Sequence, residues 1–362
     1  MRKKIISVVG ARPQFIKAAG LSLGLRKLFN EVLVHTGQHY DYEMSQVFFS
    51  GLKIPKPDYN LSVGSDTHAR QTAKIMIGLE RVIIKEKPDA LLVYGDTNST
   101  LAGPLVAAKM HIPSFHVEAG MRSFDRNMPE EINRIVADHL CQLFFCATEA
   151  SVENLREEGV TRNIYLVGNL MEEVLIRILP KAKAAQERLF KKLDIKQKRY
   201  IYTTIHRASN TDSKKILTDI VKTLLGIDRI IIFPVHPRTQ KMFKQYCLWN
   251  TLKKSTNIKL IEPVNYLESI ALQEGAKYII TDSGGIQREA YRLQVPCITL
   301  RSSTEWPETV SSGWNRLVDP TKSGITNKIH LIPRGRKIRY ETIHTSSKIV
   351  RQINNFFIRR SK

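Results

Sequence analysis

Short apolar runs alternate with longer amphipathic stretches along most of the chain. The short runs are rich in β-branched residues and predict buried strands, whereas apolar residues spaced three and four apart predict helices. In the first half we expect strands at 4–9, 31–36, 90–94, 114–117, 143–147 and 164–167. We expect helices between them at 13–27, 42–49, 67–87, 99–110 and 129–139.

The alternation continues in the second half, with strands expected at 200–204, 230–235, 258–261, 278–281 and 297–300. Helices are expected in the polar segment 181–198 and in the amphipathic stretch 346–357. Strands that alternate with helices predict parallel sheets, and 362 residues exceed what one hydrophobic core usually serves. We therefore expect an α/β protein of two Rossmann-like domains facing across a cleft. The expected bounds are 1–169, with a C-terminal helix at 346–362 packing back, and 170–345.

The chain is strongly basic, with 56 Lys and Arg against 34 Asp and Glu, for a net charge of +22. Such a field attracts nucleic acid, acidic membranes or phosphorylated small molecules. The denser basic patches, at 191–199, 334–339 and 359–362, lack interleaved aromatic residues, so we expect no nucleic-acid partner. No apolar stretch approaches the roughly 18 residues that span a bilayer, and no integral membrane segment is expected. Four cysteines without CxxC spacing suit a reducing cytoplasm.

A glycine-containing turn follows the expected strand 278–281 and opens a helix: Asp282-Ser283-Gly284-Gly285. Free backbone amides and the helix dipole favour an anion there, and the Ser283 hydroxyl could add a donor. Glu289, on the following helix, could accept from ribose hydroxyls. An ordinary turn with Asp282 and Ser283 as helix caps fits the same residues.

The first strand is followed by a similar turn, Gly10-Ala11-Arg12-Pro13, and a helix that carries Lys17. Arg12 and Lys17 could both point toward a diphosphate, although two surface cations would be unremarkable. We find neither a GxGxxG dinucleotide fingerprint nor a P-loop, so no nicotinamide cofactor is expected.

Three carboxylates follow strand ends or begin a helix in the first domain: Asp96, Glu118 and Glu130. If they converge, like charge should raise the pKa of at least one, which would place a proton donor beside an acceptor. Singly, each could be a cap or a turn residue. In the second domain, His206 and His236 each follow a strand and lie beside an arginine. No tight spacing of His, Cys, Asp and Glu suggests a metal site, and we expect none.

Taken together in chain order, these segments form a specific set. They are Gly10–Lys17, His35–His39, Gly95–Thr97, His116–Arg122, Pro129–Arg134, Ile205–Arg207 and Thr281–Gln287. The set resembles the non-hydrolysing UDP-N-acetylglucosamine 2-epimerase family, from residue 5 to about residue 318.

The resemblance implies a GT-B-like fold and interconversion of UDP-N-acetylglucosamine and UDP-N-acetylmannosamine, through elimination and re-addition of UDP by way of a 2-acetamidoglucal. It implies a UDP-sugar substrate, no cofactor and a homodimer. Asp96, Glu118 and Glu130 would be the acid/base set, with His206 assisting the leaving diphosphate. The implied substrate- and UDP-binding residues are Arg12, Lys17, Arg134, Ser283, Gly284, Gly285, Glu289 and Arg316. A second UDP-sugar, as activator, would involve Gln38, His39, Arg70, Gln71 and His236.

The sequence departs from the family pattern at Gln14, where many members carry Glu, and at 302–307. The segments around Gln14 and Phe124 also resemble relatives that act on UDP-2,3-diacetamido-2,3-dideoxyglucuronate. That substrate therefore stays open, as do a hydrolysing 2-epimerase, a GT-B glycosyltransferase and a UDP-sugar-binding protein without turnover. The basic stretch after residue 328 does not match the family well.

Overall fold

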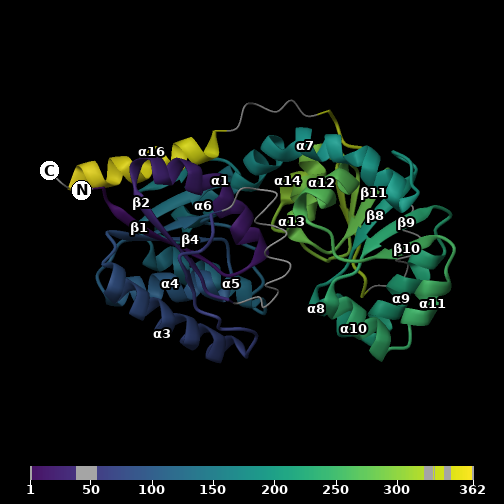
Figure 1. Ribbon diagram of the computed structural model, residues 1–362, viewed down its shortest axis with the longest axis horizontal. Helices are drawn as coiled ribbons and strands as arrows, with labels where there is room; N and C mark the ends of the chain where they lie inside the picture. Colours follow the sequence, from purple (N-terminus) through teal and green to yellow (C-terminus); the bar gives the residue numbers. More distant parts are fainter. Residues whose placement is uncertain (1, 38–54, 322–328, 330, 338–343, 361–362) are drawn as a thin grey trace. The chain divides into compact units, whose positions relative to one another are not determined.

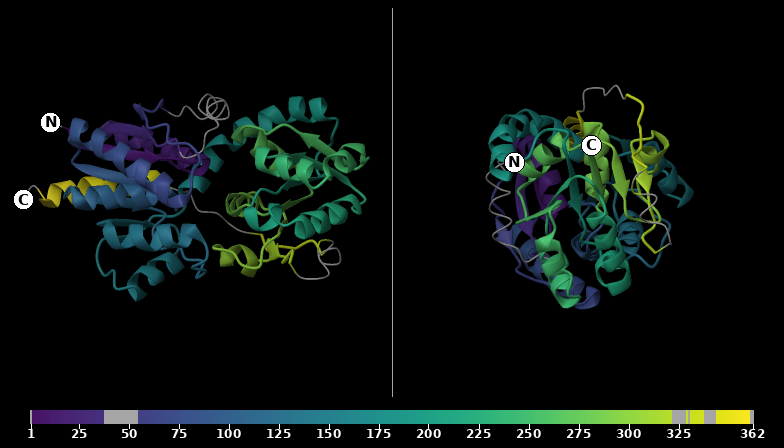
Figure 2. Two further views of the ribbon diagram at one scale, coloured as in Figure 1. Left: turned by 90° about the horizontal axis from the view of Figure 1, so that it is seen from below. Right: turned by 90° about the vertical axis from the view of Figure 1, so that its right-hand side faces the viewer.

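The computed structural model describes residues 2–37, 55–321, 329, 331–337 and 344–360. The chain divides into two compact units (Figures 1 and 2), which we call unit 1, Met1–Val174 with Thr342–Lys362, and unit 2, Leu175–Glu341. Each unit contains one parallel sheet whose strands alternate with helices. The expected α/β class with two Rossmann-like domains is confirmed.

Unit 1 is built on a seven-stranded sheet among the described residues, in the order β3-β2-β1-β4-β5-β6-β7. Its strands are β1 (Lys4–Val9), β2 (Asn30–His35), β3 (Tyr59–Asn60), β4 (Ala90–Tyr94), β5 (Ser114–Val117), β6 (Leu143–Cys146) and β7 (Ile164–Leu166). Its helices are α1 (Arg12–Leu28), α3 (His68–Glu86), α4 (Asn98–Lys109), α5 (Pro129–Leu140), α6 (Glu149–Glu157) and the C-terminal α16 (Thr345–Arg360). Helix α7 (Leu170–Leu193) runs across the division between the units.

The central strands of unit 1 are buried along almost their whole length. Parallel strands covered by helices on both faces read as continuous apolar runs, which is why sequence alone locates them well. Ile6 and Val8 of β1 and Leu91 of β4 share one core with Ile75 and Leu79 of α3. Burial of these side chains holds the helices against the sheet and fixes the strand ends that carry polar residues.

Helix α16 returns to unit 1 and packs along α1, as Figure 1 shows by the yellow helix beside the purple one. Ile349 and Ile353 are buried, and the Phe357 ring lies 5.8 Å from that of Phe29. Phe356 meets Phe115 of β5 at 5.1 Å. Both chain termini thus belong to the same unit (Figure 2).

Unit 2 contains a six-stranded sheet among its described residues, in the order β10-β9-β8-β11-β12-β13. The strands are β8 (Tyr200–Thr204), β9 (Ile230–Pro234), β10 (Ile258–Ile261), β11 (Tyr278–Thr281), β12 (Cys297–Thr299) and β13 (Asn315–Leu317). The helices are α8 (Ala208–Thr211), α9 (Lys214–Leu225), α10 (Pro237–Gln245), α11 (Trp249–Lys254), α12 (Tyr266–Gly275), α13 (Gly284–Leu293) and α14 (Pro307–Ser311).

Both sheets reverse their strand order next to the first strand of the unit. The reversal lies between β1 and β4 in unit 1 and between β8 and β11 in unit 2. Such switch points are where doubly wound sheets bind ligands, outside the carboxyl ends of the strands. Polar residues that follow these four strands are therefore the first to consider for function.

Several elements differ from the sequence expectations. The short strands β3 and β13 and helix α6 were not expected. The helix expected at 42–49 lies outside the described residues. Over the described part of the chain, none of the helices is long and apolar enough to cross a membrane.

Candidate active site

The carboxyl ends of neighbouring strands β4 and β5 place two of the expected carboxylates at one edge of the sheet. Asp96 comes two residues after β4, and Glu118 comes directly after β5. The Gly95 N–H donates to the Val117 carbonyl at 2.9 Å, which joins the two turns. The backbone of Gly95 has φ +66°, a left-handed conformation that glycine adopts without steric cost.

Glu118 has φ +73°, which is unusual for a residue with a side chain. A left-handed backbone costs a non-glycine residue about 1–2 kcal/mol, so the rest of the unit must hold it there. Strained backbone of this kind gathers at functional sites. The strain therefore singles out Glu118 among those acidic residues of unit 1 that the structure describes.

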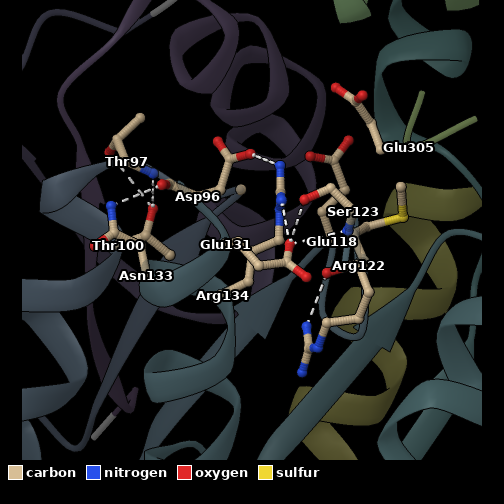
Figure 3. A network of polar contacts seen from close by, with 12 residues as sticks. Asp96, Thr97, Thr100, Glu118, Arg122, Ser123, Glu131, Asn133, Arg134 and Glu305 are labelled. Carbon is tan, nitrogen blue, oxygen red and sulfur yellow. Dashed lines mark hydrogen bonds and ion pairs between the residues drawn. The ribbon is translucent and has the colours of Figure 1, made fainter. Parts of the chain in front are cut away.

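Each of these two carboxylates is paired with a buried cation. Lys17 of α1 is 6% exposed and forms an ion pair with Glu118. Arg134 of α5 forms one with Asp96 and a second, at 2.7 Å, with Glu131. In Figure 3 the Arg134 guanidinium lies between Asp96 and Glu131. The two carboxylates thus lie in a set of matched charges.

Glu131, which is not among the residues expected to form the site, accepts hydrogen bonds from the turn beside it. Its carboxylate accepts the N–H groups of Ser123 and Phe124 at 2.9 and 2.8 Å, besides the bond from Arg134 (Figure 3). Burial alone would raise its pKa, but these hydrogen bonds hold the pKa of Glu131 below its ordinary value. Its neighbour Glu130 is exposed and makes no hydrogen bond or ion pair to the described residues. Glu130 is therefore free to meet a ligand.

Gln14 ties the turn after β1 to the turn after β4. Its side-chain oxygen accepts the N–H groups of Gly10 and Ala11 at 2.6 and 3.1 Å. Its amide nitrogen donates to the Tyr94 carbonyl and to the Thr97 hydroxyl. A backbone carbonyl can only accept, so an ionised carboxylate at this position could not make the same contact. The residue that departs from the family pattern is thus a glutamine at the switch point whose side-chain oxygen and nitrogen both make hydrogen bonds.

The turn after β1 also contains Gly10 and Arg12. A Cβ at Gly10 would collide with the side chains of Ser99 and Thr36, so only glycine lets the chains approach this closely. Arg12 is the first residue of α1, and its side chain lies outside the described part of the structure.

In unit 2, two polar turns follow the strands at the switch point. Ser283 caps α13, its hydroxyl oxygen accepting from the Ile286 N–H, and Gly284 and Gly285 form the first turn of that helix. A helix N-terminus with free amides suits an anion. Glu289, one turn further, is buried, and its carboxylate accepts from Gln273 at 2.6 Å.

Asp282 fixes the neighbouring turn, which carries His206. Its buried carboxylate accepts the backbone N–H groups of His206 and Arg207 at 3.0 and 2.9 Å. The rings of His206 and His236 lie 5.7 Å apart, so the structure brings the two expected histidines together. Arg316, by contrast, is exposed on the edge strand β13.

The residues implied for an activator site are dispersed over both units. Gln38 and His39 lie outside the described residues. Arg70 is exposed on α3, whereas the buried Gln71 donates to the Gly64 carbonyl at 2.8 Å and accepts from Asn98 at 2.7 Å. Within the described residues, no group of three or more His, Cys, Asp or Glu side chains has a metal-binding arrangement.

One feature of α5, the spacing of its charged residues, can be read from the sequence. Glu131, Arg134 and Asp138 follow one another at intervals of three and four residues, so they share one helix face. All three are buried, against the usual preference of charged residues for solvent. The spacing is visible in the sequence, whereas the burial of these charges is decided by the tertiary structure.

Comparison with known proteins agrees with this geometry. The family model described as UDP-N-acetylglucosamine 2-epimerase matches residues 22–354. A UDP-N-acetylglucosamine 2-epimerase homolog of Methanococcus maripaludis is 48% identical over 97% of this chain and 99% of its own. The UDP-2,3-diacetamido-2,3-dideoxy-D-glucuronate 2-epimerase of Pseudomonas aeruginosa is 42% identical over 89% of this chain and 90% of its own.

Among solved structures, the UDP-GlcNAc 2-epimerase of Methanocaldococcus jannaschii, in complex with UDP-GlcNAc and UDP, superimposes with a TM-score of 0.90. It is 42% identical, and the match covers 97% of this chain and 99% of that one. The likeness confirms the expected GT-B-like fold, and the coverage is nearly complete in both directions. The chain belongs to the UDP-N-acetylglucosamine 2-epimerase family.

Proposed function

We propose that this protein interconverts UDP-N-acetylglucosamine and UDP-N-acetylmannosamine without hydrolysis. The observation that carries the proposal is the pair of carboxylates at the switch-point edge of unit 1. Asp96 and Glu118 end neighbouring strands, each is held by a buried cation, and Glu118 is kept in a strained backbone conformation. Such a pair suits removal of a proton from one face of a sugar carbon and its return from the other.

The reaction needs help at the diphosphate as well as at the sugar. The C2–H bond is a weak acid, so the C1–O bond must break as a carboxylate takes the proton. The electron pair of C2–H becomes the C1=C2 bond of a 2-acetamidoglucal, and the C1–O pair leaves with UDP. Return of a proton to the other face of C2 and attack of UDP on C1 complete the epimerisation. The sequence is redox-neutral, so it requires no hydride-carrying cofactor.

The roles are assigned by chemistry. Asp96, Glu118 and the exposed Glu130 form the acid/base set, while Lys17 and Arg134 balance their charge. In unit 2, His206 assists departure of the diphosphate. The residues proposed to bind UDP are Arg12, Ser283, Gly284, Gly285, Glu289 and Arg316.

A second substrate is favoured by a specific observation. The chain is 42% identical to the Pseudomonas diacetamido-glucuronate epimerase and 45% identical to the Methanocaldococcus UDP-N-acetylglucosamine 2-epimerase, a difference of only three percentage points. Overall similarity therefore does not separate the two sugars. We propose UDP-2,3-diacetamido-2,3-dideoxyglucuronate as the alternative, since the same C2 chemistry applies to it.

Two further proposals concern assembly and regulation. We propose that the protein is a homodimer. We also propose that a second UDP-sugar activates it through Gln38, His39, Arg70, Gln71 and His236.

The test is incubation with each UDP-sugar in deuterated water, followed by NMR. We expect deuterium at C2 and appearance of the manno epimer, with no free monosaccharide. Exchange with the diacetamido-uronate alone would establish the second substrate. Free N-acetylmannosamine would indicate hydrolysis, transfer that requires an acceptor would indicate a glycosyltransferase, and binding without conversion would leave a UDP-sugar-binding protein.

Glu118→Gln tests the site itself. Loss of a positioned acid/base should lower turnover by about 10²–10⁴-fold while UDP binding is retained, because the proposed UDP contacts are on other residues. Glu157→Gln, on the exposed surface of α6, is the matched control and should keep full activity. Unchanged turnover in Glu118→Gln would remove Glu118 from the mechanism.

A further inference from the structure

Strand β5 carries a histidine that the proposed mechanism does not use. His116 lies in the middle of the sheet and has no exposed surface. Its Nδ1 is 2.6 Å from an Asp138 carboxylate oxygen, and its Nε2 is 2.7 Å from the Gly95 carbonyl oxygen. Both ring nitrogens thus face oxygen atoms, which is an unusual environment for a buried imidazole.

The partners decide where the ring protons are. A backbone carbonyl can only accept, so Nε2 carries a hydrogen. Asp138 also accepts from the Gly120 N–H at 3.0 Å and contacts Arg122 at 2.8 Å. These two partners, a backbone N–H and a guanidinium, only donate, so they bind Asp138 as an ionised carboxylate. An ionised carboxylate only accepts, so Nδ1 carries a hydrogen as well, and His116 is an imidazolium.

The charges around this imidazolium balance without the candidate active site. Arg122 also binds both oxygens of Glu158, at 2.7 and 2.6 Å. Two cations, His116 and Arg122, therefore meet two anions, Asp138 and Glu158, in one connected set. The other buried titratable groups beside Asp138 are thiols whose pKa is raised by burial, to about 12 in Cys146 and higher still in Cys141. These thiols are neutral at neutral pH and add no charge to the set. The two cations are therefore balanced by Asp138 and Glu158, without a contribution from Asp96 or Glu118.

On one side, His116 holds the turn that carries Asp96. The Gly95 carbonyl accepts from the His116 ring, and the Gly95 N–H donates to the Val117 carbonyl. Both backbone polar groups of Gly95 are therefore bonded to β5. Since Asp96 directly follows Gly95, these two bonds fix the direction in which it leaves the sheet.

On the other side, Asp138 holds the turn that carries Glu118. It accepts the N–H of Gly120, which has φ +74°, two residues after Glu118 with φ +73°. Both are left-handed, and this is the turn whose strain requires support. The His116–Asp138 pair thus joins the turn that carries Asp96 to the turn that carries Glu118 through hydrogen bonds to Gly95 and Gly120.

We propose that His116 is a positioning residue: a buried imidazolium that, with Asp138, sets the spacing of Asp96 and Glu118. This role adds a positioning residue to the proposed function. It rests on that function in every experiment that measures turnover. It predicts that the ring does no chemistry on the substrate and acts only through the two turns.

Two substitutions separate the two ring contacts. In His116→Asn the amide nitrogen takes the place of Nδ1, so the bond to Asp138 is kept and the bond to Gly95 is lost. In His116→Gln the amide nitrogen takes the place of Nε2, so the Gly95 bond is kept and Asp138 loses one of its two cations and keeps Arg122. Because a misplacement of about 1 Å can cost about 10²-fold in rate, we expect kcat to fall by about that factor in His116→Asn, with KM nearly unchanged.

The order of effects tests positioning against a merely structural role. We expect His116→Gln to retain the higher kcat but the lower stability to urea, since removing one partner of a buried ion pair costs more than leaving a backbone carbonyl without its donor. A residue needed only for folding would rank both properties in the same order. His111→Asn, on the exposed turn after α4, is the control and should leave kcat and stability unchanged.

A direct measurement does not depend on turnover. At neutral pH, the ¹⁵N-histidine NMR spectrum of the intact wild-type protein should show both ring N–H protons of His116. A single ring N–H, or wild-type kcat in folded His116→Asn, would overturn the inference. If the wild-type protein converts neither UDP-sugar, the proposed function fails, and the NMR spectrum alone decides the charge of His116.

Discussion

Replacement of Glu131 by glutamine should destabilise unit 1, because four donors converge on its carboxylate. They are the Ser123 N–H and hydroxyl, the Phe124 N–H and the Arg134 guanidinium, at 2.7 to 3.0 Å. Glutamine keeps the shape but turns one acceptor into a donor, so at least one buried N–H loses its partner. The unsatisfied group and the weakened charge-assisted bonds together cost about 3 kcal/mol.

The effect should depend on pH in a defined direction. The hydrogen bonds hold the pKa of Glu131 below its ordinary value, so its contribution to stability is present above the unfolded-state pKa, about 4.3. As the pH falls below that value toward the folded-state pKa, the contribution is lost. The difference between wild type and Glu131→Gln should therefore be largest at neutral pH and narrow on acidification.

Hydrogen exchange of helix α5 during urea titration measures this effect in unit 1. All three tryptophans, Trp249, Trp306 and Trp314, are in unit 2, so their fluorescence provides an internal control that should change little. Glu130→Gln, one residue away and exposed, should lie within about 0.5 kcal/mol of wild type in stability. Equal stability of Glu131→Gln and wild type at neutral pH, or a gap that widens in acid, would refute the reasoning.

Two other predictions follow from backbone geometry and burial. Gly95→Ala and Gly159→Ala both place a side chain at positive φ, at a cost of about 1 kcal/mol each, but only a Cβ at 95 approaches Lys17 Nζ, at 3.2 Å. Steady-state kinetics should show lost turnover in Gly95→Ala alone, and equal losses in both would contradict this. Of the four cysteines only Cys247 is exposed, so a thiol reagent should modify one thiol in the native protein and four after unfolding. Rapid modification of a second native thiol would disprove the assigned burial.

Much of the architecture could be predicted from local pattern. Strands β1, β4, β5, β8 and β11 were expected with the bounds observed, because apolar runs covered on both faces leave a clear signal, and the bounds of the edge strand β10 were expected as well. The short strands β3 and β13 and the helix α6 leave only a weak pattern in the sequence. They were not predicted from it. The motif order was sufficient to predict the family, since polar residues after strand ends occur in one characteristic sequence.

The sequence by itself thus determined the fold class, the family and the positions of Asp96 and Glu118 at strand ends. Only the tertiary structure decided the partners of those carboxylates: Lys17, Arg134 and, beneath them, His116 with Asp138. It also showed that the side chain of Glu131 is buried and that of Glu130 is exposed. The sequence, in which the two are adjacent glutamates, does not reveal this difference. The reason is that periodicity reports which face of an element is apolar. The pairing of buried charges depends on which elements meet, across as many as 101 residues of chain between Lys17 and Glu118.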